Sequence, residues 1–268
     1  QEIKSIEQRH QGRFLVTIIT KNQLYMLIKF YFNPKTKDVN AATNKFDPII
    51  NGKTANITAF PYFAFLSKNN RSLRCGGAII KTNVILTAAH CLTTAELLVF
   101  TGVEHLDDLP NRQPHHVKKI IQYPEYRGQT RFDLGLVILS DHIQLGPTAR
   151  LIDVAPVSPR IGSKVTIAGF GKVMCDTSSV DIGGRCRGGD SKVLRSATFR
   201  LASHSNRIIK TNGSNQNTCY GDSGSPVVHR NRVIGVVSSG EYINCSGYDT
   251  QAPTAPFYDW IQEHLKKY

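Results

Sequence analysis

Short β-type runs separated by turn residues are the feature of this chain that most restricts its fold. From residue 49 onward, apolar runs of four to seven residues recur at 62–66, 77–80, 84–89, 96–100, 134–139, 164–170, 225–228 and 233–239. No periodic stretch of helix length lies between them. Regularly spaced short strands of this kind are typical of antiparallel sandwiches and barrels. The sequence therefore predicts an all-β fold.

The end of the chain is the one segment with a helical pattern. In APFYDWIQEHLKKY the apolar side chains recur at helical spacing and fall on one face: Phe257, Trp260, Ile261 and Leu265. Two lysines follow at the C-terminal end, where the helix dipole favours cations. We expect a C-terminal α-helix that packs against the β-structure.

The composition changes near residues 33–48, a polar stretch that is bounded by prolines and typical of a linker. Before it, residues 13–32 are the most apolar stretch, but lysines interrupt them, so they are too short and too charged to span a bilayer. Their β-branched and aromatic content favours strands or a pro-segment. We therefore predict an N-terminal pro-segment or linker of unknown structure over 1–48 and a globular domain over 49–268.

The chain is basic, with a formal net charge of +13. Residues 1–48 hold six Lys and two Arg against four acids, so +9 of this charge belongs to residues 49–268. A basic excess suggests polyanion binding. However, no block of Lys and Arg accompanies it, and the nearest approach is Lys118-Lys119. A basic secreted surface is favoured, and no specific nucleic-acid partner is predicted.

The six cysteines point to an oxidising compartment. They are even in number and none lies in a CxxC motif, which favours three disulfides over a zinc site: Cys75, Cys91, Cys175, Cys186, Cys219 and Cys245. Sequons for N-glycosylation agree, the last of them weakened by a cysteine at its middle position: Asn56, Asn70, Asn212 and Asn244. We predict a secreted, extracellular glycoprotein, or a periplasmic protein if the source is bacterial.

Three segments carry residues suited to acyl transfer. GDSG places Ser223 between glycines, where the backbone can turn sharply and approach a ligand. LTAAHC sets His90 at the end of a strand-like run, and RFDLGLVIL sets Asp133 at the mouth of a buried strand, where a carboxylate needs a partner. A serine becomes a nucleophile when an imidazole takes its proton and a carboxylate orients that imidazole.

These motifs resemble those of the chymotrypsin-fold (trypsin-like) serine proteases, in the family's order of His, Asp and Ser. IINGKTANITAFPYFAFL resembles the mature N-terminus, CGGAIIKTNVILTAAHC the histidine motif, DLGLVIL the aspartate motif and GDSGSP the serine motif. GVVSSG and FYDWIQEHL are similar to the substrate-binding segment and the terminal helix. The resemblance covers residues 49–268. It implies two six-stranded antiparallel β-barrels, a C-terminal α-helix and an active site between the barrels.

The resemblance implies a serine endopeptidase that acts on proteins or peptides without a cofactor, with protein protease inhibitors as further candidate partners. His90 would be the general base, Asp133 its orienter and Ser223 the nucleophile. The backbone N–H groups of Gly221 and Ser223 would form the oxyanion hole. Ser238–Gly240 would bind the substrate backbone as an added strand. The rival interpretation is a non-proteolytic homologue that binds a partner or a polyanion.

The resemblance also implies the disulfides Cys75–Cys91 and Cys219–Cys245. The pair Cys175 and Cys186 is left in a Gly-rich segment, where it would staple an inserted loop near the cleft. Two residues depart from the family pattern. Ser225 stands where a second glycine usually follows the nucleophile, and Ser239 stands where a tryptophan is usual, which would open one wall of the cleft.

Activation in this family follows cleavage before the mature N-terminus, whose α-amino group pairs with the aspartate before the nucleophile, here Ile49 with Asp222. The bond to be cut follows Pro48, and proline is a poor residue to cleave after. A trypsin-type activator is therefore not expected, and the activating protease is unknown. A specialised activator, upstream cleavage with trimming, and a permanent zymogen stay open. The complete triad favours an active enzyme.

Asn217 takes the position that forms the floor of the primary specificity pocket. A neutral amide removes the demand for Arg or Lys in the substrate and favours a chymotrypsin-like or broad preference. The rival comes from an irregular loop expected over 245–253. From that loop Asp249 or Thr250 approaches the same pocket, and an inward Asp249 would restore a basic preference.

No metal site is predicted. The pair His115-His116 has no acid or cysteine near it in the sequence, so a surface pair is favoured. The segment VEHLDDLPNRQ carries acids at one end only, whereas the calcium loop of the family uses acids at both ends.

Overall fold

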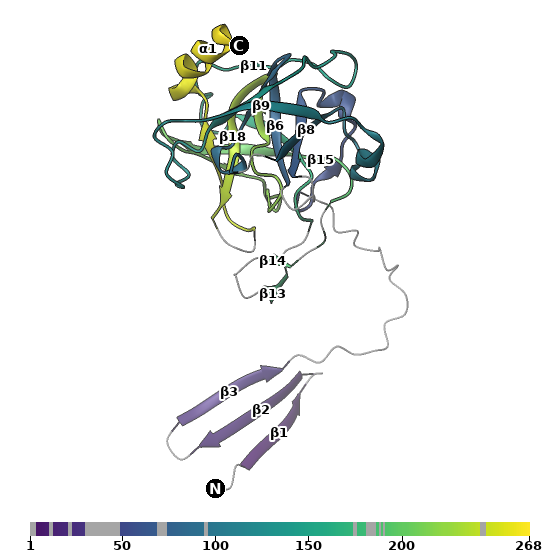
Figure 1. Cartoon of the computed structure of the whole chain (residues 1–268). Coiled ribbons are helices and arrows are strands. Elements are labelled where there is room, and N and C mark those ends of the chain that lie inside the picture. The colour runs from purple at the N-terminus through teal and green to yellow at the C-terminus, as the bar shows by residue number, and fades with distance from the viewer. Residues whose placement is uncertain are drawn as a thin grey trace. The chain divides into compact units, whose positions relative to one another are not determined.

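The computed structural model describes residues 4–10, 13–20, 23–29, 49–68, 74–93, 96–173, 176–180, 186–187, 189, 191–241 and 245–268. The chain separates into two compact units, Gln1–Lys45 and Phe46–Tyr268. The first unit holds a three-stranded antiparallel sheet of β1 (Lys4–His10), β2 (Arg13–Thr20) and β3 (Gln23–Lys29) (Figure 1). The apolar stretch 13–32 thus forms two adjacent strands, and the predicted linker over 33–48 lies outside the described residues.

The second unit begins with a closed antiparallel barrel whose strands follow the order β10-β7-β6-β5-β8-β9. These strands are β5 (Phe63–Lys68), β6 (Arg74–Lys81), β7 (Val84–Thr87), β8 (Leu97–Thr101), β9 (His115–Gln122) and β10 (Gly135–Leu139). Every residue of β7 and β10 is buried. Such strands read as continuous apolar runs, which is why the sequence revealed them.

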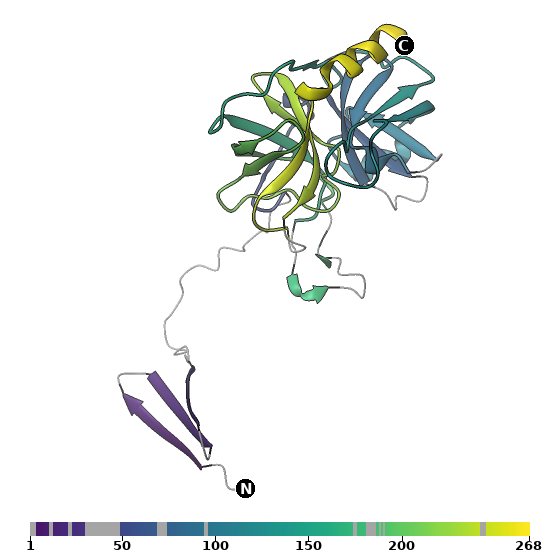
Figure 2. The same ribbon diagram turned by 90° about the vertical axis from the view of Figure 1, so that its left-hand side faces the viewer.

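The second barrel has the strand order β18-β17-β12-β15-β16-β19, and the pairing of β18 with β19 closes it. Its strands are β12 (Lys164–Gly169), β15 (Arg195–His204), β16 (Ile209–Asn212), β17 (Pro226–His229), β18 (Arg232–Gly240) and β19 (Asp249–Pro253). The short strands β4 (Lys53–Thr54) and β11 (Asp153–Val154) join its edges at β15 and β18. Figure 2 shows the two barrels side by side.

The C-terminal helix α1 (Tyr258–Lys267) follows the second barrel but packs against the first, as Figure 1 and Figure 2 show. The ring of Tyr123, just after β9, lies 4.6 Å from that of Phe257 and 5.3 Å from that of Trp260. Ile261 is fully buried, and Lys81 Nζ donates to the Leu265 carbonyl at 2.9 Å. The helix therefore fastens the barrels together. The prediction of two six-stranded barrels with a C-terminal helix is confirmed.

Several shorter elements complete the domain. Four 3-10 helices span Ile57–Ala59, Ala89–Cys91, Leu106–Asn111 and Ala255–Phe257. Strands β13 (Asp176–Val180) and β14 (Cys186–Arg187) pair with each other. The predicted pair of Cys175 and Cys186 falls outside the residues whose side chains are described. Within the described part of the chain, no helix is both long and apolar enough to cross a membrane.

Candidate active site

His90 and Asp133 meet in the first barrel. His90 lies in the 3-10 turn that follows β7, and the disulfide Cys75–Cys91 ties this turn to β6. The Nδ1 atom of His90 lies 2.7 Å from Oδ2 of Asp133, and the His90 backbone N–H donates to Oδ1 at 2.9 Å. The Asp133 side chain is 3% exposed and the His90 side chain 32% exposed. A buried carboxylate thus orients an imidazole whose Nε2 is left for chemistry.

A third donor to this carboxylate comes from the second barrel. Ser238 Oγ, on β18, donates to Asp133 Oδ2 at 2.5 Å. Three donors satisfy the buried carboxylate, as a buried charge requires. From the sequence, Ser238 is expected to contact the substrate backbone, and this hydrogen bond is not evident there. The signal was available only as a hydroxyl in the strand that the resemblance places at the cleft.

Ser223 lies in a turn held between the segments that carry His90 and Ser238. Its carbonyl accepts from Gly76 N at 2.7 Å, and Gly224 N donates to the Val237 carbonyl at 2.7 Å. Gly224 has a φ of +76°, and a Cβ there would lie 3.1 Å from the backbone nitrogen of Ala88. The turn therefore requires glycine and lies against the backbone that leads into His90.

The structure brings the three predicted catalytic residues to one place without closing every contact. Among the described residues, hydrogen bonds join His90 to Asp133, and none joins Ser223 Oγ to His90. Such contacts often tighten only when substrate is bound. The backbone N–H groups of Gly221 and Ser223 have no internal acceptor within the described chain, so both can donate to a ligand.

Asp222 is a fully buried carboxylate beside the nucleophile turn. Gly171 N donates to its Oδ1 at 2.8 Å and Cys219 N to its Oδ2 at 3.0 Å. A Cβ on Gly169 or Gly171 would lie 2.2 Å from one of these oxygens, so the carboxylate occupies space that only glycine leaves. Burial raises the pKa of Asp222 to about 7, although the two backbone donors oppose the shift.

Ile49 is fully buried in the core of the second barrel. Its φ of +39° lies in the left-handed region, which β-branched residues rarely adopt. The next residue, Ile50, forms an antiparallel bridge with Asn217. The start of the domain is thereby joined to the segment that leads into the nucleophile turn. Among the described residues no hydrogen bond links Ile49 to Asp222.

Asn217 and Asp249 share one site. Asn217 Nδ2 donates to the Gly247 carbonyl at 2.7 Å and lies 3.5 Å from Asp249 Oδ1, while Thr218 N donates to Asp249 Oδ2 at 2.9 Å. Asp249 is 1% exposed, and burial raises its pKa to about 6. The expectation of an irregular loop over 245–253 was wrong from residue 249 onward, because β19 begins at Asp249 and pairs with β16 and β18.

The segment Ser238–Gly240 forms the end of β18. One edge pairs with β19, in the register Ser239 with Thr250 and Gly240 with Asp249. On the other side the pairing with β17 ends at Val236. In the described part of the chain no strand covers the remaining edge of Ser238–Gly240. Ser239 Oγ lies 3.2 Å from Thr130 Oγ1.

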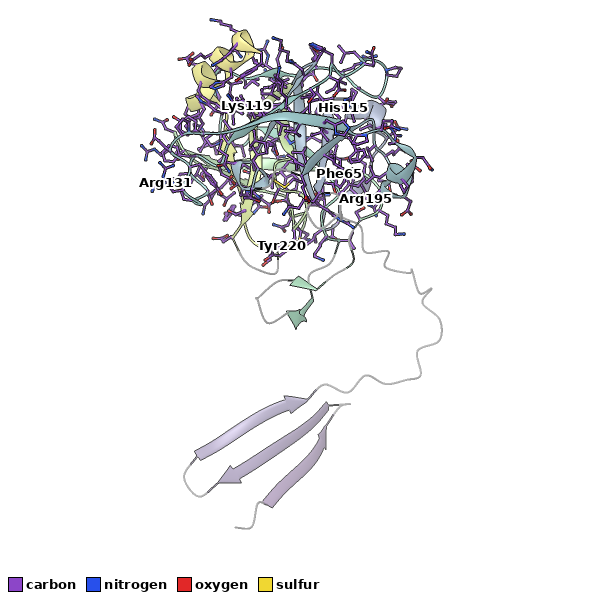
Figure 3. All side chains as sticks on the ribbon, in the orientation of Figure 1. Phe65, His115, Lys119, Arg131, Arg195 and Tyr220 are labelled. Carbon is purple, nitrogen blue, oxygen red and sulfur yellow. A yellow bond between two sulfur atoms is a disulfide. The ribbon has the colours of Figure 1, made fainter. Side chains whose placement is uncertain are left out.

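The second disulfide near the site joins Cys219 to Cys245, as the resemblance implied for this pair and for Cys75–Cys91. A group of potential metal ligands, Cys75, His90 and Cys91, consists of that disulfide and the oriented histidine. Away from the site, on β9 (Figure 3), His115 Nδ1 lies 2.6 Å from Asp141 Oδ2. The sequence did not reveal this partner because it is 26 residues away along the chain.

Ser225 carries a buried hydroxyl that has no hydrogen-bond partner among the described residues. An unpaired buried hydroxyl costs about 1–3 kcal/mol, so we expect Ser225→Ala to raise the free energy of unfolding by about 1 kcal/mol. Denaturant unfolding measures this change.

Ser191→Ala is the matched control, because Ser191 is also buried but its hydroxyl bonds the backbone of Val193. It should lower the free energy of unfolding by about 1 kcal/mol. A loss of stability in Ser225→Ala of the same size would show that its hydroxyl has a partner.

A family model for trypsin matches residues 49–261. The chain is similar to serine protease SP24D of Anopheles gambiae, 28% identical over 227 residues that cover 82% of each chain. It is also similar to trypsin-3 of Homo sapiens, 29% identical over 230 residues that cover 82% of this chain and 73% of the relative.

Solved structures share the fold. Neuropsin from mouse brain has a TM-score of 0.71 at 24% identity, covering 80% of this chain and 99% of that one. Human heparin binding protein has a TM-score of 0.70 at 23% identity, covering 81% and 96%. With the family match spanning most of the domain, the chain belongs to the trypsin family and is a serine endopeptidase.

Proposed function

We propose that this protein is a secreted protease, made as a zymogen, which hydrolyses peptide bonds with Ser223 as nucleophile, His90 as general base and Asp133 as the group that orients it. The observation that carries the proposal is the hydrogen bond of 2.7 Å between His90 Nδ1 and Asp133 Oδ2, beside the turn that holds Ser223. A carboxylate that accepts from Nδ1 leaves Nε2 as the base.

The reaction proceeds in two halves. His90 Nε2 takes the proton of Ser223 Oγ as that oxygen attacks the scissile carbonyl, and the N–H groups of Gly221 and Ser223 receive the developing oxyanion. The imidazolium then gives its proton to the leaving amine, and the C–N bond breaks. Water repeats the sequence on the acyl-enzyme, which releases the acid and restores the serine.

The free edge of Ser238–Gly240 is the proposed seat of the substrate backbone. An extended peptide can add to an uncovered strand edge through main-chain hydrogen bonds. Because Ser238 also bonds Asp133, this edge is fixed relative to the catalytic carboxylate. A peptide bound there lies along the strand whose Val237 carbonyl holds Gly224.

For the primary pocket we propose a preference for neutral side chains. Both oxygens of Asp249 already face donors, the amide of Asn217 and the N–H of Thr218, and the residue is almost completely buried. The Asn217 amide group faces the Gly247 carbonyl, which can only accept, so its own oxygen remains available to a substrate. Asp249 then orients Asn217 and does not bind a substrate cation.

We expect Asp249→Asn to keep the neutral preference and to change kcat/KM for neutral substrates by less than about tenfold, since an uncharged hydrogen bond of about 1 kcal/mol is exchanged for another. A library of peptides that differ in the residue before the cleaved bond measures it. Cleavage after Arg or Lys in the wild type that disappears in Asp249→Asn would overturn this assignment.

Activation is proposed to follow cleavage before Ile49, whose new α-amino group would pair with Asp222. The proposal is supported by the burial of both residues and by the bridge from Ile50 to Asn217. A buried carboxylate is tolerated best when a cation pairs with it. N-terminal sequencing of the native protein would show whether the chain begins at Ile49.

A fluorophosphonate probe tests the function directly. Pro48→Arg creates a bond that trypsin can cut before Ile49, and the cut protein should then be labelled at Ser223. Ser223→Ala should not be labelled, whereas Ser225→Ala should be, because Ser225 is buried two residues further on. If the cut protein with Ser223 intact stays unlabelled, the protein is a non-proteolytic homologue.

A further inference from the structure

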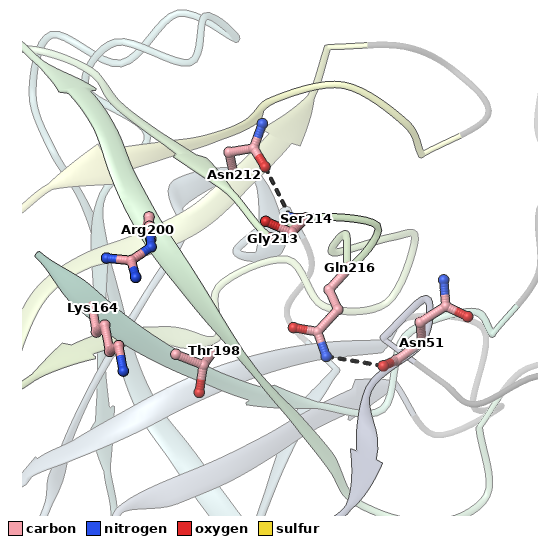
Figure 4. A pocket seen from close by; sticks show the side chains of 8 residues that line it. All are labelled: Asn51, Lys164, Thr198, Arg200, Asn212, Gly213, Ser214 and Gln216. Atoms are coloured by element: carbon pink, nitrogen blue, oxygen red, sulfur yellow. Dashed lines mark hydrogen bonds between the residues drawn. The ribbon is translucent and has the colours of Figure 1, made fainter. Parts of the chain in front are cut away.

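A polar cavity of about 480 Å³ lies on the second barrel, away from the triad (Figure 4). One wall comes from β12 and β15, and the other from the segment after β16 and from the start of the domain. The residues that matter for its chemistry are Lys164, Thr198, Arg200, Asn212, Gln216 and Asn51.

Two cations face each other across neighbouring strands of this cavity. Lys164 on β12 is the direct register partner of Arg200 on β15, and Arg200 is in turn the partner of Asn212 on β16. The intervening residues Val165 and Phe199 are buried in the barrel core, so the row of three faces outward. Like charges directly opposite each other in a sheet are destabilising.

Nothing in the cavity offsets this repulsion. No acidic side chain lines it in the described part of the chain. The Arg200 Nη1 atom donates to the Gly162 carbonyl at 3.2 Å, which leaves the other guanidinium N–H groups available. The Asn212 oxygen accepts from Ser214 N at 2.9 Å, which leaves its amide group as a donor. The lining is therefore cationic and rich in donors, and it lacks only an anion.

We propose that this cavity binds a sulfate or phosphate group between the Lys164 ammonium and the Arg200 guanidinium. Guanidinium N–H groups match two oxygens of a tetrahedral oxyanion, and an ammonium supplies a compact charge beside it. Such a ligand replaces the repulsion between the two cations by two attractive contacts. The group can belong to a free anion or to a sulfated polysaccharide.

A bound anion would also brace the start of the protease domain. Asn51 Nδ2 donates to the Asn215 carbonyl at 2.7 Å, and Gln216 Nε2 donates to the Asn51 carbonyl at 2.9 Å. The same two segments continue into the bridge between Ile50 and Asn217. An occupied cavity therefore holds the wall on which residues 49–52 rest, and binding should raise the melting temperature.

Titration with sodium sulfate, at an ionic strength kept constant with sodium chloride, tests the site by calorimetry and by thermal unfolding. A parallel titration uses a heparin-type sulfated oligosaccharide. All proteins carry Asn212→Gln, which keeps an amide in the cavity and removes the sequon. The test variant is Lys164→Gln with Arg200→Gln, and the control is Lys118→Gln with Lys266→Gln, which loses the same charge at exposed positions elsewhere.

Saturable sulfate binding that is at least about tenfold weaker in the test variant, and unchanged in the control, supports the site. Oligosaccharide binding with the same selective loss identifies a polysaccharide as a source of the group, and sulfate binding alone identifies the free anion. The proposal is overturned if sulfate has no effect beyond that of chloride, or if both variants lose affinity equally, which would indicate attraction by net charge alone.

Discussion

Asp133→Asn is expected to lower kcat by about 10⁴-fold, the magnitude that the same exchange has in another serine protease with this triad. Asp133 accepts from His90 Nδ1, from the His90 backbone and from Ser238. An asparagine amide turned toward Nδ1 donates where the carboxylate accepted. The imidazole then carries its proton on Nε2 and cannot take the proton of Ser223.

The measurement is kcat and KM on a peptide substrate with protein cut before Ile49. Because the substituted side chain has the same shape, KM should change little while kcat falls. Ser238→Ala is the matched control, since it removes one donor to the same carboxylate and leaves the Nδ1 contact intact. It should cost about tenfold, the value of one hydrogen bond to a charged group. Equal losses in the two variants would contradict the proposed role of Asp133.

The second large effect concerns the pH dependence of stability in the uncut chain. Burial raises the pKa of Asp222 from 3.8 to about 7. The folded state then binds a proton that the unfolded chain has already released, so the free energy of unfolding falls as the pH rises from about 4 to about 7. A shift of about three pKa units corresponds to about 4 kcal/mol over that range.

Denaturant unfolding of Ser223→Ala, in which the Pro48–Ile49 bond stays intact, measures this loss. Adding Asp222→Asn removes the titrating group, so the difference in unfolding free energy between the two proteins should grow by about 4 kcal/mol between pH 4 and pH 7. Adding Asp108→Asn, at an exposed position, should leave the difference constant. A constant difference for Asp222→Asn as well would show that the carboxylate is not desolvated.

Cleavage before Ile49 should reverse this behaviour. A paired ammonium lowers the pKa of a carboxylate. The pair then contributes stability that is present at neutral pH and is lost on acidification through the lowered pKa. Comparison of the cut and uncut forms of Ser223→Ala therefore reports on the pairing independently of catalysis.

The sequence predicted those parts of the fold in which apolar residues are continuous. Strands β7 and β10 are buried at every position and read as unbroken apolar runs. Strands β9, β16 and β19 escaped notice because exposed, half-buried or polar residues interrupt them, as in His115–Gln122. Their strand character comes from neighbours on both sides, which a local pattern does not contain.

The candidate site divides in the same way. Its three principal side chains lie in motifs with a recognisable local context, so the chemistry of His90, Asp133 and Ser223 could be predicted. The contacts of Ser238 with Asp133, and of Asp249 with Asn217, join residues 105 and 32 positions apart. No local pattern encodes them, because closure of the barrels creates them.

The left-handed backbone of Ile49 gives the uncut domain a stored torsion. A β-branched residue held at positive φ costs about 1–3 kcal/mol while a peptide bond fixes the atom before its nitrogen. Once that bond is hydrolysed, φ no longer constrains the residue, and the ammonium can rotate freely while the side chain keeps its buried place. The intact junction thus behaves as a cocked spring, whose release makes the cut effectively irreversible and adds its energy to the ordered state of the domain.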